Sequence, residues 1–482
     1  MDNPISLAGQ IAKNTLYQLV GKFFGTIFGL ITVGLMTRYL GQTGYGHYTT
    51  VISFLQFFGV LADFGLQMAT TQMLSRPMAN QKKIFGNILA LRLISIILTL
   101  GLATLIGWLA PYPLIIKQGI SLASLSFLFI ALQSIFISVF QKNLAMAQVA
   151  LAEIWGRIAL LAGVALAVGY QWGLLGILGA VVIGNLINLV ILIEQSRRYI
   201  KVAPEIDWLV WKKIWHVAWP LAITIALTLV YFRADTIIMS LTRPQNEVGI
   251  YGAVYRVLEV LIQFPYLFLG LLLPLLTKFF TLNKNLFNLI LQKAFDFLVI
   301  LTIPMIFASI ILGPKIMILI AGPEFAVSGE LFKILIFAVA AIYLSALFGY
   351  AIVACELQKK MIKFYLTDAL VSLVLYLTLI PIYSYWAAAY LTIFTEAFIA
   401  IAAFGVIKKY TNFSPNLKVA AKATLASLIM SLVLLLLLKQ HLLLLIAIGL
   451  VVYFWALYLL RGFSRKTIAE ITNLRSINAP KN

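Results

Sequence analysis

Long apolar runs follow one another along most of the chain, and short polar segments rich in lysine and arginine separate them. Each run is long enough to cross the roughly 30 Å hydrocarbon core of a bilayer as a helix, which takes about 20 residues. The pattern therefore predicts fourteen membrane-spanning helices. We expect them near residues 15–38, 48–70, 84–108, 117–140, 149–169, 173–195, 214–240, 249–275, 290–312, 332–354, 362–382, 386–406, 419–438 and 440–461.

The composition of the chain agrees with this pattern. Of the 482 residues, 62% are hydrophobic and only 11% are charged, whereas charged residues make up about a quarter of a typical soluble protein. The apolar runs are long and unbroken, which favours helices over the short alternating segments of a transmembrane barrel. We therefore predict an all-α polytopic membrane protein.

The basic residues predict how the chain is oriented in the membrane. With a cytoplasmic N-terminus, the cytoplasmic segments hold about four times as many lysine and arginine residues as the outer segments, which is the bias expected of the cytoplasmic side. Both termini are then cytoplasmic, because the predicted number of spans is even. We therefore expect a multi-pass protein whose two ends lie on the cytoplasmic side of the membrane. This bias and contact with anionic lipid headgroups explain the net charge of +20 without a nucleic-acid partner.

A polar connection and an internal repeat divide the chain. Residues 197–213 form the longest connection among the first twelve spans and contain five basic residues and two tryptophans, so we expect a linker along the membrane surface. A shift of 203 residues aligns Gly46 with Gly249 and Tyr48 with Tyr251. The repeat predicts two lobes of the same orientation, related by a pseudo-two-fold axis along the membrane normal. The expected parts are an N-terminal six-helix lobe (1–196), a cytoplasmic linker (197–213), a C-terminal six-helix lobe (214–407), and two additional helices with a cytoplasmic tail (408–482).

The predicted hairpin of the seventh and eighth spans carries four charged residues at lipid depth, Arg233, Asp235, Arg256 and Glu259. An ionised side chain at mid-membrane costs at least about 2.5–3.5 kcal/mol on insertion scales. Arg233 and Arg256 each lie about eight residues from the turn, so we expect their guanidinium groups at a similar depth. Two cations at one level suggest an anion-binding cavity. The alternative is mutual neutralisation, in which Arg256 pairs with Glu259 or is bridged by Asp235.

Three further cations, Lys22, Arg92 and Arg157, lie about two turns into the first, third and fifth spans. Together with the two arginines of the hairpin they are candidates for a cationic lining that binds phosphate, because a guanidinium group donates paired hydrogen bonds. Two structural interpretations compete with this one. Glu153 lies four residues before Arg157 and can pair with it, and Lys22 and Arg92 can extend to the lipid headgroups.

Asp368 and Glu396 are isolated acids in the eleventh and twelfth spans. With Asp235 and Glu259 they are candidates for binding H+ or Na+ and coupling transport to an ion gradient, and a structural role is the alternative. We expect no other cofactor and no metal, because the three histidines are isolated and there is a single cysteine. The sequence carries no Walker motif and no Ser/His/Asp constellation, so we do not expect an enzyme.

Short motifs occur at the expected turns. They are Thr37-Arg38-Tyr39-Leu40-Gly41, Gly44-Tyr45-Gly46, Ala62-Asp63-Phe64-Gly65-Leu66, and Tyr231-Phe232-Arg233-Ala234-Asp235 followed by Val248-Gly249-Ile250-Tyr251. In these motifs and in span count, the chain resembles the bacterial polysaccharide and O-antigen flippases, the oligosaccharide flippase family of the multidrug/oligosaccharidyl-lipid/polysaccharide exporter superfamily. The resemblance implies alternating access between two lobes and transport of polyprenyl-pyrophosphate-linked oligosaccharide from the cytoplasmic to the outer leaflet. It also implies that the last two spans shelter the lipid tail.

The resemblance therefore implies a flippase of the bacterial cytoplasmic (inner) membrane that serves the export of cell-surface polysaccharide. Its expected partners are the lipid-linked oligosaccharide, membrane lipids, and a polysaccharide polymerase with its export machinery. Three alternatives stay open: a multidrug cation antiporter of the same superfamily, a lipid II flippase, and a membrane scaffold that transports nothing. The antiporter predicts an acidic cavity and usually twelve spans, which the five cations within the spans and the two additional helices disfavour.

Overall fold

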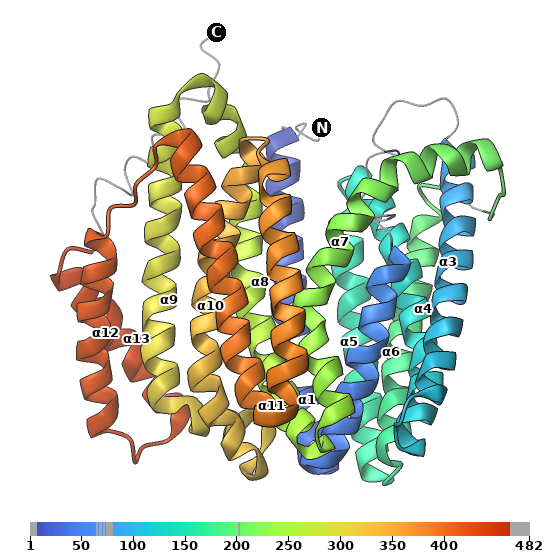
Figure 1. Cartoon of the computed structure of the whole chain (residues 1–482), viewed down its shortest axis with the longest axis horizontal. Coiled ribbons are helices and arrows are strands. Elements are labelled where there is room, and N and C mark those ends of the chain that lie inside the picture. The colour runs from blue at the N-terminus through green and yellow to red at the C-terminus, as the bar shows by residue number, and fades with distance from the viewer. Residues whose placement is uncertain are drawn as a thin grey trace, which may run out of the picture. The chain divides into compact units, whose positions relative to one another are not determined.

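The computed structural model describes residues 7–63, 66, 70, 73, 81–200 and 203–462, and these residues form helices and no strands (Figure 1). Residues 64 and 65 of one motif and residues 463–482 of the predicted tail lie outside this description. The helices are α1 (Leu7–Asp63), α3 (Gln81–Leu109), α4 (Leu114–Lys142), α5 (Met146–Gly169), α6 (Gly173–Ser196), α7 (Trp208–Thr242), α8 (Gln245–Leu282), α9 (Lys284–Ala321), the short η1 (Pro323–Phe325), α10 (Ala326–Ala354), α11 (Gln358–Thr411), α12 (Lys418–Leu436) and α13 (Leu442–Leu459).

Each predicted span overlaps one of these helices. The helices are fewer than the spans because α1 covers the first two spans and α11 covers the eleventh and twelfth. The backbone turns within α1 at Gly41 (φ 62°) and within α11 at Ser384 (φ 56°), since a positive φ interrupts an α-helix. In the described part of the chain, eleven helices are long and apolar enough to cross a membrane. The predicted all-α polytopic fold is confirmed.

The chain divides into two compact units. The long helices α8, α9 and α11 each contribute residues to both. The first unit contains Met1–Val257, Ile318–Phe325 and Tyr365–Leu391, and the second contains Leu258–Met317, Ala326–Phe364 and Thr392–Asn482.

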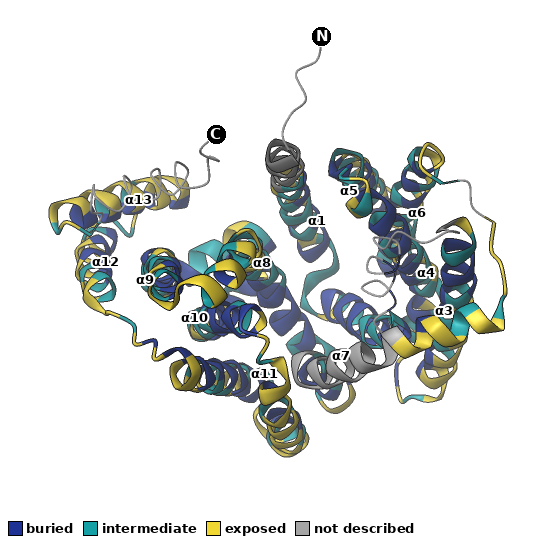
Figure 2. Ribbon diagram, turned by 90° about the horizontal axis from the view of Figure 1, so that it is seen from above, coloured by how far each residue is buried: buried dark blue, intermediate teal, exposed yellow. Residues whose placement is uncertain are grey.

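Small residues allow the helices of the first unit to pack closely. A Cβ atom added to Gly156 of α5 would lie 3.0 Å from the carbonyl oxygen of Gly184 of α6, and one added to Gly163 would lie 2.8 Å from Cβ of Ala180. Close approach of this kind stabilises helix pairs in lipid, where the acyl chains are as apolar as the side chains. Many apolar side chains, such as Leu98 of α3, accordingly stay exposed on the outer faces of the helices (Figure 2).

Helix α7 begins at Trp208, within the predicted linker of residues 197–213, and the residue before it, Asp207, is attached to the start of α3. The backbone N–H of Asp207 donates to Oδ1 of Asn87 (2.6 Å), and the Asp207 carboxylate pairs with Nζ of Lys83 (2.6 Å). The same carboxylate caps α7 by accepting from the backbone N–H groups of Leu209 and Val210. These bonds, the one from Lys83 first, hold the pKa of Asp207 below its ordinary value. From this anchor the first turns of α7 run at a steep angle to α3 (Figure 1).

The helices α1 and α8 cross where a glycine of each faces the backbone of the other. A Cβ atom added to Gly46 would lie 1.7 Å from the carbonyl oxygen of Gln245, and one added to Gly249 would lie 2.0 Å from that of Gln42. The shift of 203 residues relates Gln42 to Gln245 as it relates Gly46 to Gly249. The same contact is therefore made twice, which is what a pseudo-two-fold axis requires. The Thr50 hydroxyl also donates to Oε1 of Gln245 (2.7 Å).

The motif at residues 37–41 makes further contacts within the first unit. The Arg38 guanidinium donates to the backbone carbonyl oxygen of Leu319 (2.6 Å), in the last turn of α9, where carbonyl groups lack helical partners. A cation at a helix C-terminus is also favoured by the helix dipole. The Tyr39 hydroxyl accepts from the backbone N–H of Gly173 at the start of α6 (2.9 Å). The motif thus joins α1 to α6 and to the end of α9.

In the second unit, the hairpin of α12 and α13 packs on α9. The Tyr453 hydroxyl donates to the carbonyl oxygen of Ile300 (2.6 Å), and Nζ of Lys315 donates to that of Gln440 (3.1 Å). A cluster of buried apolar side chains from α9, α12 and α13, which includes Ile300 and Tyr453, packs the three helices together. The two additional helices are therefore a packed part of the second unit.

We expect that replacing either glycine of the crossing of α1 and α8 with alanine destabilises the protein. In Gly46→Ala and Gly249→Ala the new methyl group meets a backbone carbonyl, which cannot rotate away as a side chain can. Overpacking typically costs about 1–3 kcal/mol, so each variant should unfold in detergent at a lower temperature than the parent protein. Gly29→Ala is the control, because nothing lies within 4 Å of the added methyl group. Equal melting temperatures for all three variants would contradict the close crossing.

The single cysteine, Cys355, follows α10 directly and is buried. Burial raises the pKa of its thiol to about 12, so the reactive thiolate is scarce at neutral pH. We expect the folded protein in detergent to react with a maleimide at least about tenfold more slowly than protein unfolded in SDS. Mass spectrometry of timed samples measures the two rates. Similar rates would mean that the turn after α10 is open in solution.

Candidate functional site

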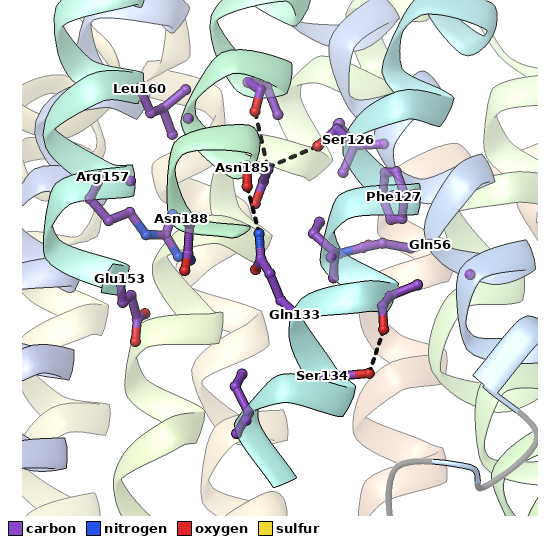
Figure 3. A pocket seen from close by; sticks show the side chains of 18 of the residues that line it. Gln56, Ser126, Phe127, Gln133, Ser134, Glu153, Arg157, Leu160, Asn185 and Asn188 are labelled. Atoms are coloured by element: carbon purple, nitrogen blue, oxygen red, sulfur yellow. Dashed lines mark hydrogen bonds between the residues drawn. The ribbon is translucent and has the colours of Figure 1, made fainter. Parts of the chain in front are cut away.

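A cavity of about 690 Å³ lies inside the first unit, within the size range of ligand pockets. Its wall is formed by α1, α3, α4, α5 and α6, with one residue from α8. The charged side chains of the wall are Asp63, Arg92, Glu153, Arg157 and Arg256. The polar uncharged ones include Gln56, Ser126, Gln133, Ser134, Asn185 and Asn188 (Figure 3).

Arg92 is only 3% exposed, and its donors are occupied. The guanidinium pairs with Asp63 (2.8 Å) and donates to the carbonyl oxygens of Ala62 (3.1 Å) and Ala131 (3.2 Å) and to the Ser134 hydroxyl (3.3 Å). Because Ala62 lies in the last turn of α1, its carbonyl group has no helical partner of its own. Arg92 thus joins the end of α1 to α3 and α4 and has few donors left for a ligand. Its burial also excludes the extended, headgroup-contacting conformation considered from the sequence.

Arg157 and Arg256 are the other two cations of the wall. Arg157 points from α5 toward Asn188 of α6 (Figure 3). The ion pair that the spacing suggests between Glu153 and Arg157 is absent from the described structure. Glu153 instead lies against α1, where its Oε1 would be 3.5 Å from a Cβ atom at Gly25. A spacing of four residues allows a pair on a helix but does not require one.

Amide groups make up much of the remaining wall. Nε2 of Gln133 donates to the backbone carbonyl of Asn185 (2.8 Å), and Nδ2 of Asn185 donates to the Ser126 hydroxyl (2.8 Å), so both bonds join α4 to α6. Gln56 and Asn188 form no hydrogen bond within the described residues, and Oδ1 of Asn188 is buried. These residues were not among the sequence-predicted candidates. Uncharged amides within apolar runs are the signal that would have revealed them.

Lys22 and Arg233 do not line this cavity. Their side chains are partly buried, on α1 and α7 respectively. The structure thus brings three of the five predicted cations, those at positions 92, 157 and 256, to one cavity. A phosphate-binding role for Lys22 and Arg233 stays a prediction.

Asp235 is held by tyrosines of α8. It is 1% exposed, and its Oδ2 accepts from the hydroxyl groups of Tyr251 (2.5 Å) and Tyr255 (3.2 Å). Its Oδ1 accepts from the backbone N–H of Thr236 (2.6 Å). The alternative that Asp235 bridges Arg256 across the hairpin is therefore wrong, because tyrosine hydroxyls occupy the carboxylate. These bonds join α7 to α8.

The other predicted coupling acids do not line the cavity either. Asp368 of α11 is 1% exposed; its Oδ1 accepts weakly from the Ser372 hydroxyl (3.4 Å), and its Oδ2 has no hydrogen-bond partner among the described residues. Glu396 of α11 is 6% exposed, and Glu259 of α8 is partly buried. The described ranges contain no group of three or more His, Cys, Asp or Glu residues that could hold a metal ion. Ion coupling by these acids stays a prediction.

Several solved structures share this fold. The chain is similar to a structure described as the lipid II flippase MurJ in an inward closed conformation, with a TM-score of 0.76 and 17% identity over 92% of this chain and 98% of that chain. It is also similar to an inward-facing multidrug resistance MATE family transporter of the MOP superfamily (TM-score 0.67, 12% identity, 83% of this chain and 98% of that chain). A third is a MOP superfamily transporter from Pyrococcus furiosus (TM-score 0.59, 11% identity, 84% of this chain and 96% of that chain). These similarities define the class of fold, a two-lobe helical membrane protein.

The family model of polysaccharide biosynthesis proteins matches residues 11–280, more than half of the chain, and the protein belongs to this family. A search of curated proteins gives no significant match. The resemblance to polysaccharide flippases that the motifs indicated is confirmed, as is the two-lobe architecture. The protein is thus a multi-pass membrane protein of the polysaccharide biosynthesis family, and it shares the fold of these flippases and transporters.

Breaking the Arg92–Asp63 pair should destabilise the protein. Removing one partner of a buried pair leaves an uncompensated charge and can cost up to about 3–5 kcal/mol. Arg92→Met and Asp63→Leu should therefore each lower the melting temperature in detergent. The double variant should regain part of that loss, because both charges are removed together. If the two single losses simply add in the double variant, the side chains do not act as a pair.

Proposed function

We propose that the protein is a flippase that moves polyprenyl-pyrophosphate-linked oligosaccharide from the cytoplasmic to the outer leaflet for the export of cell-surface polysaccharide. The observation that carries the proposal is a cavity inside a membrane-spanning unit whose wall contains Arg157 and Arg256. Guanidinium groups suit a pyrophosphate, because they donate paired hydrogen bonds to phosphate oxygens. Membership of the polysaccharide biosynthesis family supports the choice of an oligosaccharide headgroup.

The charge of the wall supports an anionic ligand. The wall holds three arginines and two acids, and Asp63 is neutralised by Arg92. Glu153 is the other acid and Arg157 and Arg256 are the other cations, so arginines outnumber acids in the wall. A positive wall attracts phosphate and disfavours the cationic drugs expected of a multidrug cation antiporter, although the fold is shared with MATE transporters.

Alternating access requires one end of the bundle to close while the other opens. We propose that the crossing of α1 and α8, together with the contact of Arg38 with α9, forms the closed end of the first unit. We assign this end to the outer side of the bacterial inner membrane and both termini to the cytoplasm, following the distribution of basic residues. The cavity is then loaded from the cytoplasmic side, while the lipid tail stays in the bilayer.

An ion gradient is the expected source of energy. Carboxylates within the membrane are candidates to bind H+ or Na+, and we assign this role to Asp235, Glu259, Asp368 and Glu396. We expect no cofactor and no enzymatic step. The expected partners are the lipid-linked oligosaccharide, the surrounding lipids, and a polysaccharide polymerase with its export machinery.

Two rival functions have distinct consequences. The similarity to the MurJ structure favours a lipid II flippase, which predicts that the protein restores growth to cells depleted of their own lipid II flippase. A scaffold that transports nothing predicts that the cavity arginines affect only folding and abundance. We expect neither result.

Replacing the cavity arginines should abolish transport without lowering abundance. Arg157→Gln and Arg256→Gln keep a polar side chain but remove the charge that binds phosphate. A hydrogen bond to a charged group contributes about 1.5–3 kcal/mol, so surface polysaccharide should fall at least about tenfold in cells that depend on this protein. The matched control is Arg197→Gln, because Arg197 is exposed and pairs with Glu194. Polysaccharide on the cell surface and protein in the membrane are measured together.

Binding of farnesyl pyrophosphate to purified protein in detergent provides a second measurement. Affinity should fall in both variants and should fall with rising salt, since salt screens the attraction. If both arginine variants are instead lost from the membrane, the result would favour a scaffold that transports nothing. Full transport by both variants would exclude this cavity as the phosphate site.

A further inference from the structure

Four amide side chains line the cavity beside its arginines: Gln56, Gln133, Asn185 and Asn188. Gln133 and Asn185 use their N–H donors to join α4 to α6, and their side-chain oxygens accept no hydrogen bond from the described residues. Gln56 and Asn188 form no hydrogen bond there at all. Because an amide oxygen carries two acceptor lone pairs and its nitrogen two donors, the wall offers both kinds of group to a ligand.

Helix packing does not explain the whole group. An unsatisfied amide in a membrane is costly, and its usual role there is to bind a neighbouring helix. The bond from Gln133 to Asn185 is of this kind. Gln56 and Asn188 make no such bond and lie in the cavity wall, where Oδ1 of Asn188 is buried without a partner. A ligand with hydroxyl groups in the cavity would give these two side chains hydrogen-bond partners through their atoms that face the cavity.

The amides lie next to the cationic part of the wall. Cβ of Asn188 is 2.9 Å from the position of a Cβ atom at Gly156, the residue before Arg157. Arg157 extends toward Asn188 in Figure 3. A group bound by the amides is therefore adjacent to a phosphate bound by Arg157. The volume of about 690 Å³ is that of a pocket for a drug-sized molecule, so the cavity admits the start of a headgroup but not a long oligosaccharide.

We propose that Gln56, Gln133, Asn185 and Asn188 form a subsite for the sugar attached directly to the pyrophosphate. This inference rests on the proposed function and adds a specificity determinant to it. Sugar hydroxyl groups donate and accept hydrogen bonds, as amides do, and the uncharged amides suit a neutral sugar. A site built to hydrogen-bond a hydroxyl group rejects a ligand that lacks it. The subsite selects the headgroup by its first sugar, and the sugars beyond it lie outside the cavity.

Ligand binding to the purified full-length protein in detergent tests the subsite. The probes are farnesyl pyrophosphate, which carries no sugar, and farnesyl pyrophosphate linked to glucose, galactose or N-acetylglucosamine. At least one sugar-linked probe should bind at least about threefold more tightly than farnesyl pyrophosphate. Gln56→Met and Asn188→Leu remove the amide at similar size. Each substitution should lower the affinity for that sugar-linked probe about three- to tenfold and leave the affinity for farnesyl pyrophosphate unchanged.

The matched control is Gln195→Met, seven residues after Asn188 on α6 and not in the cavity wall; it should change neither affinity. Melting temperatures show whether each variant is folded. The comparison of the four probes on the wild-type protein tests the subsite even if a variant does not fold. Equal wild-type affinity for all four probes, or equal weakening of every probe in the variants, would overturn the subsite and leave the phosphate site standing. Failure of the wild-type protein to bind any of the four probes would overturn the proposed function as well.

Discussion

A guanidinium group within a membrane needs either polar partners or water, and the first unit contains both solutions. Arg92 has partners, because its nitrogens contact Asp63 and carbonyl groups of α1 and α4. Arg157 lies instead in the wall of a 690 Å³ cavity and forms no ion pair in the described part of the chain. A charge at mid-membrane costs at least about 2.5–3.5 kcal/mol, so neither side chain is stable facing acyl chains. The first solution fixes helix ends, and the second provides a place where an anion can bind.

The two solutions depend on each other because the cavity is the space left between helices that are held at their contacts. Arg92 holds the end of α1 and the middle of α4 against α3. The bond from Gln133 to Asn185 holds α4 to α6, and the close approach at Gly156 brings α5 against α6. Lipid gives no hydrophobic advantage to helix association, so polar bonds and small residues carry this task. The residues that shape the cavity are thus of the same chemical kinds as those that line it.

Most of the fold could be predicted from the sequence, because a span is encoded locally by about 20 apolar residues and because the repeat relates Gly46 to Gly249. The site could be predicted only in part. A charge within a span signals a functional candidate, but its role depends on groups far away in the chain, such as the carbonyl of residue 131 that Arg92 reaches. Helix spacing suggested the pair of Glu153 and Arg157, whereas tertiary packing places the acid against α1. Amides such as Asn188 carry no charge, so a search for charged residues in the spans does not detect them.

One short segment of α8 connects the crossing with α1 to the cavity. Gly249, at the crossing with α1, and Arg256, in the cavity wall, lie two turns apart on the same face of α8, about 10 Å along its axis. The prolines of α8 lie beyond this segment, and the Tyr251 hydroxyl binds Asp235 of α7 within it. An unbroken helix moves as a rigid body, so separation of α1 and α8 at the crossing displaces Arg256 relative to Arg157. In the proposed mechanism, an anion that contacts both arginines would bind with different affinities to the states in which the crossing is closed and open. Such a difference is what allows a ligand to shift a conformational equilibrium.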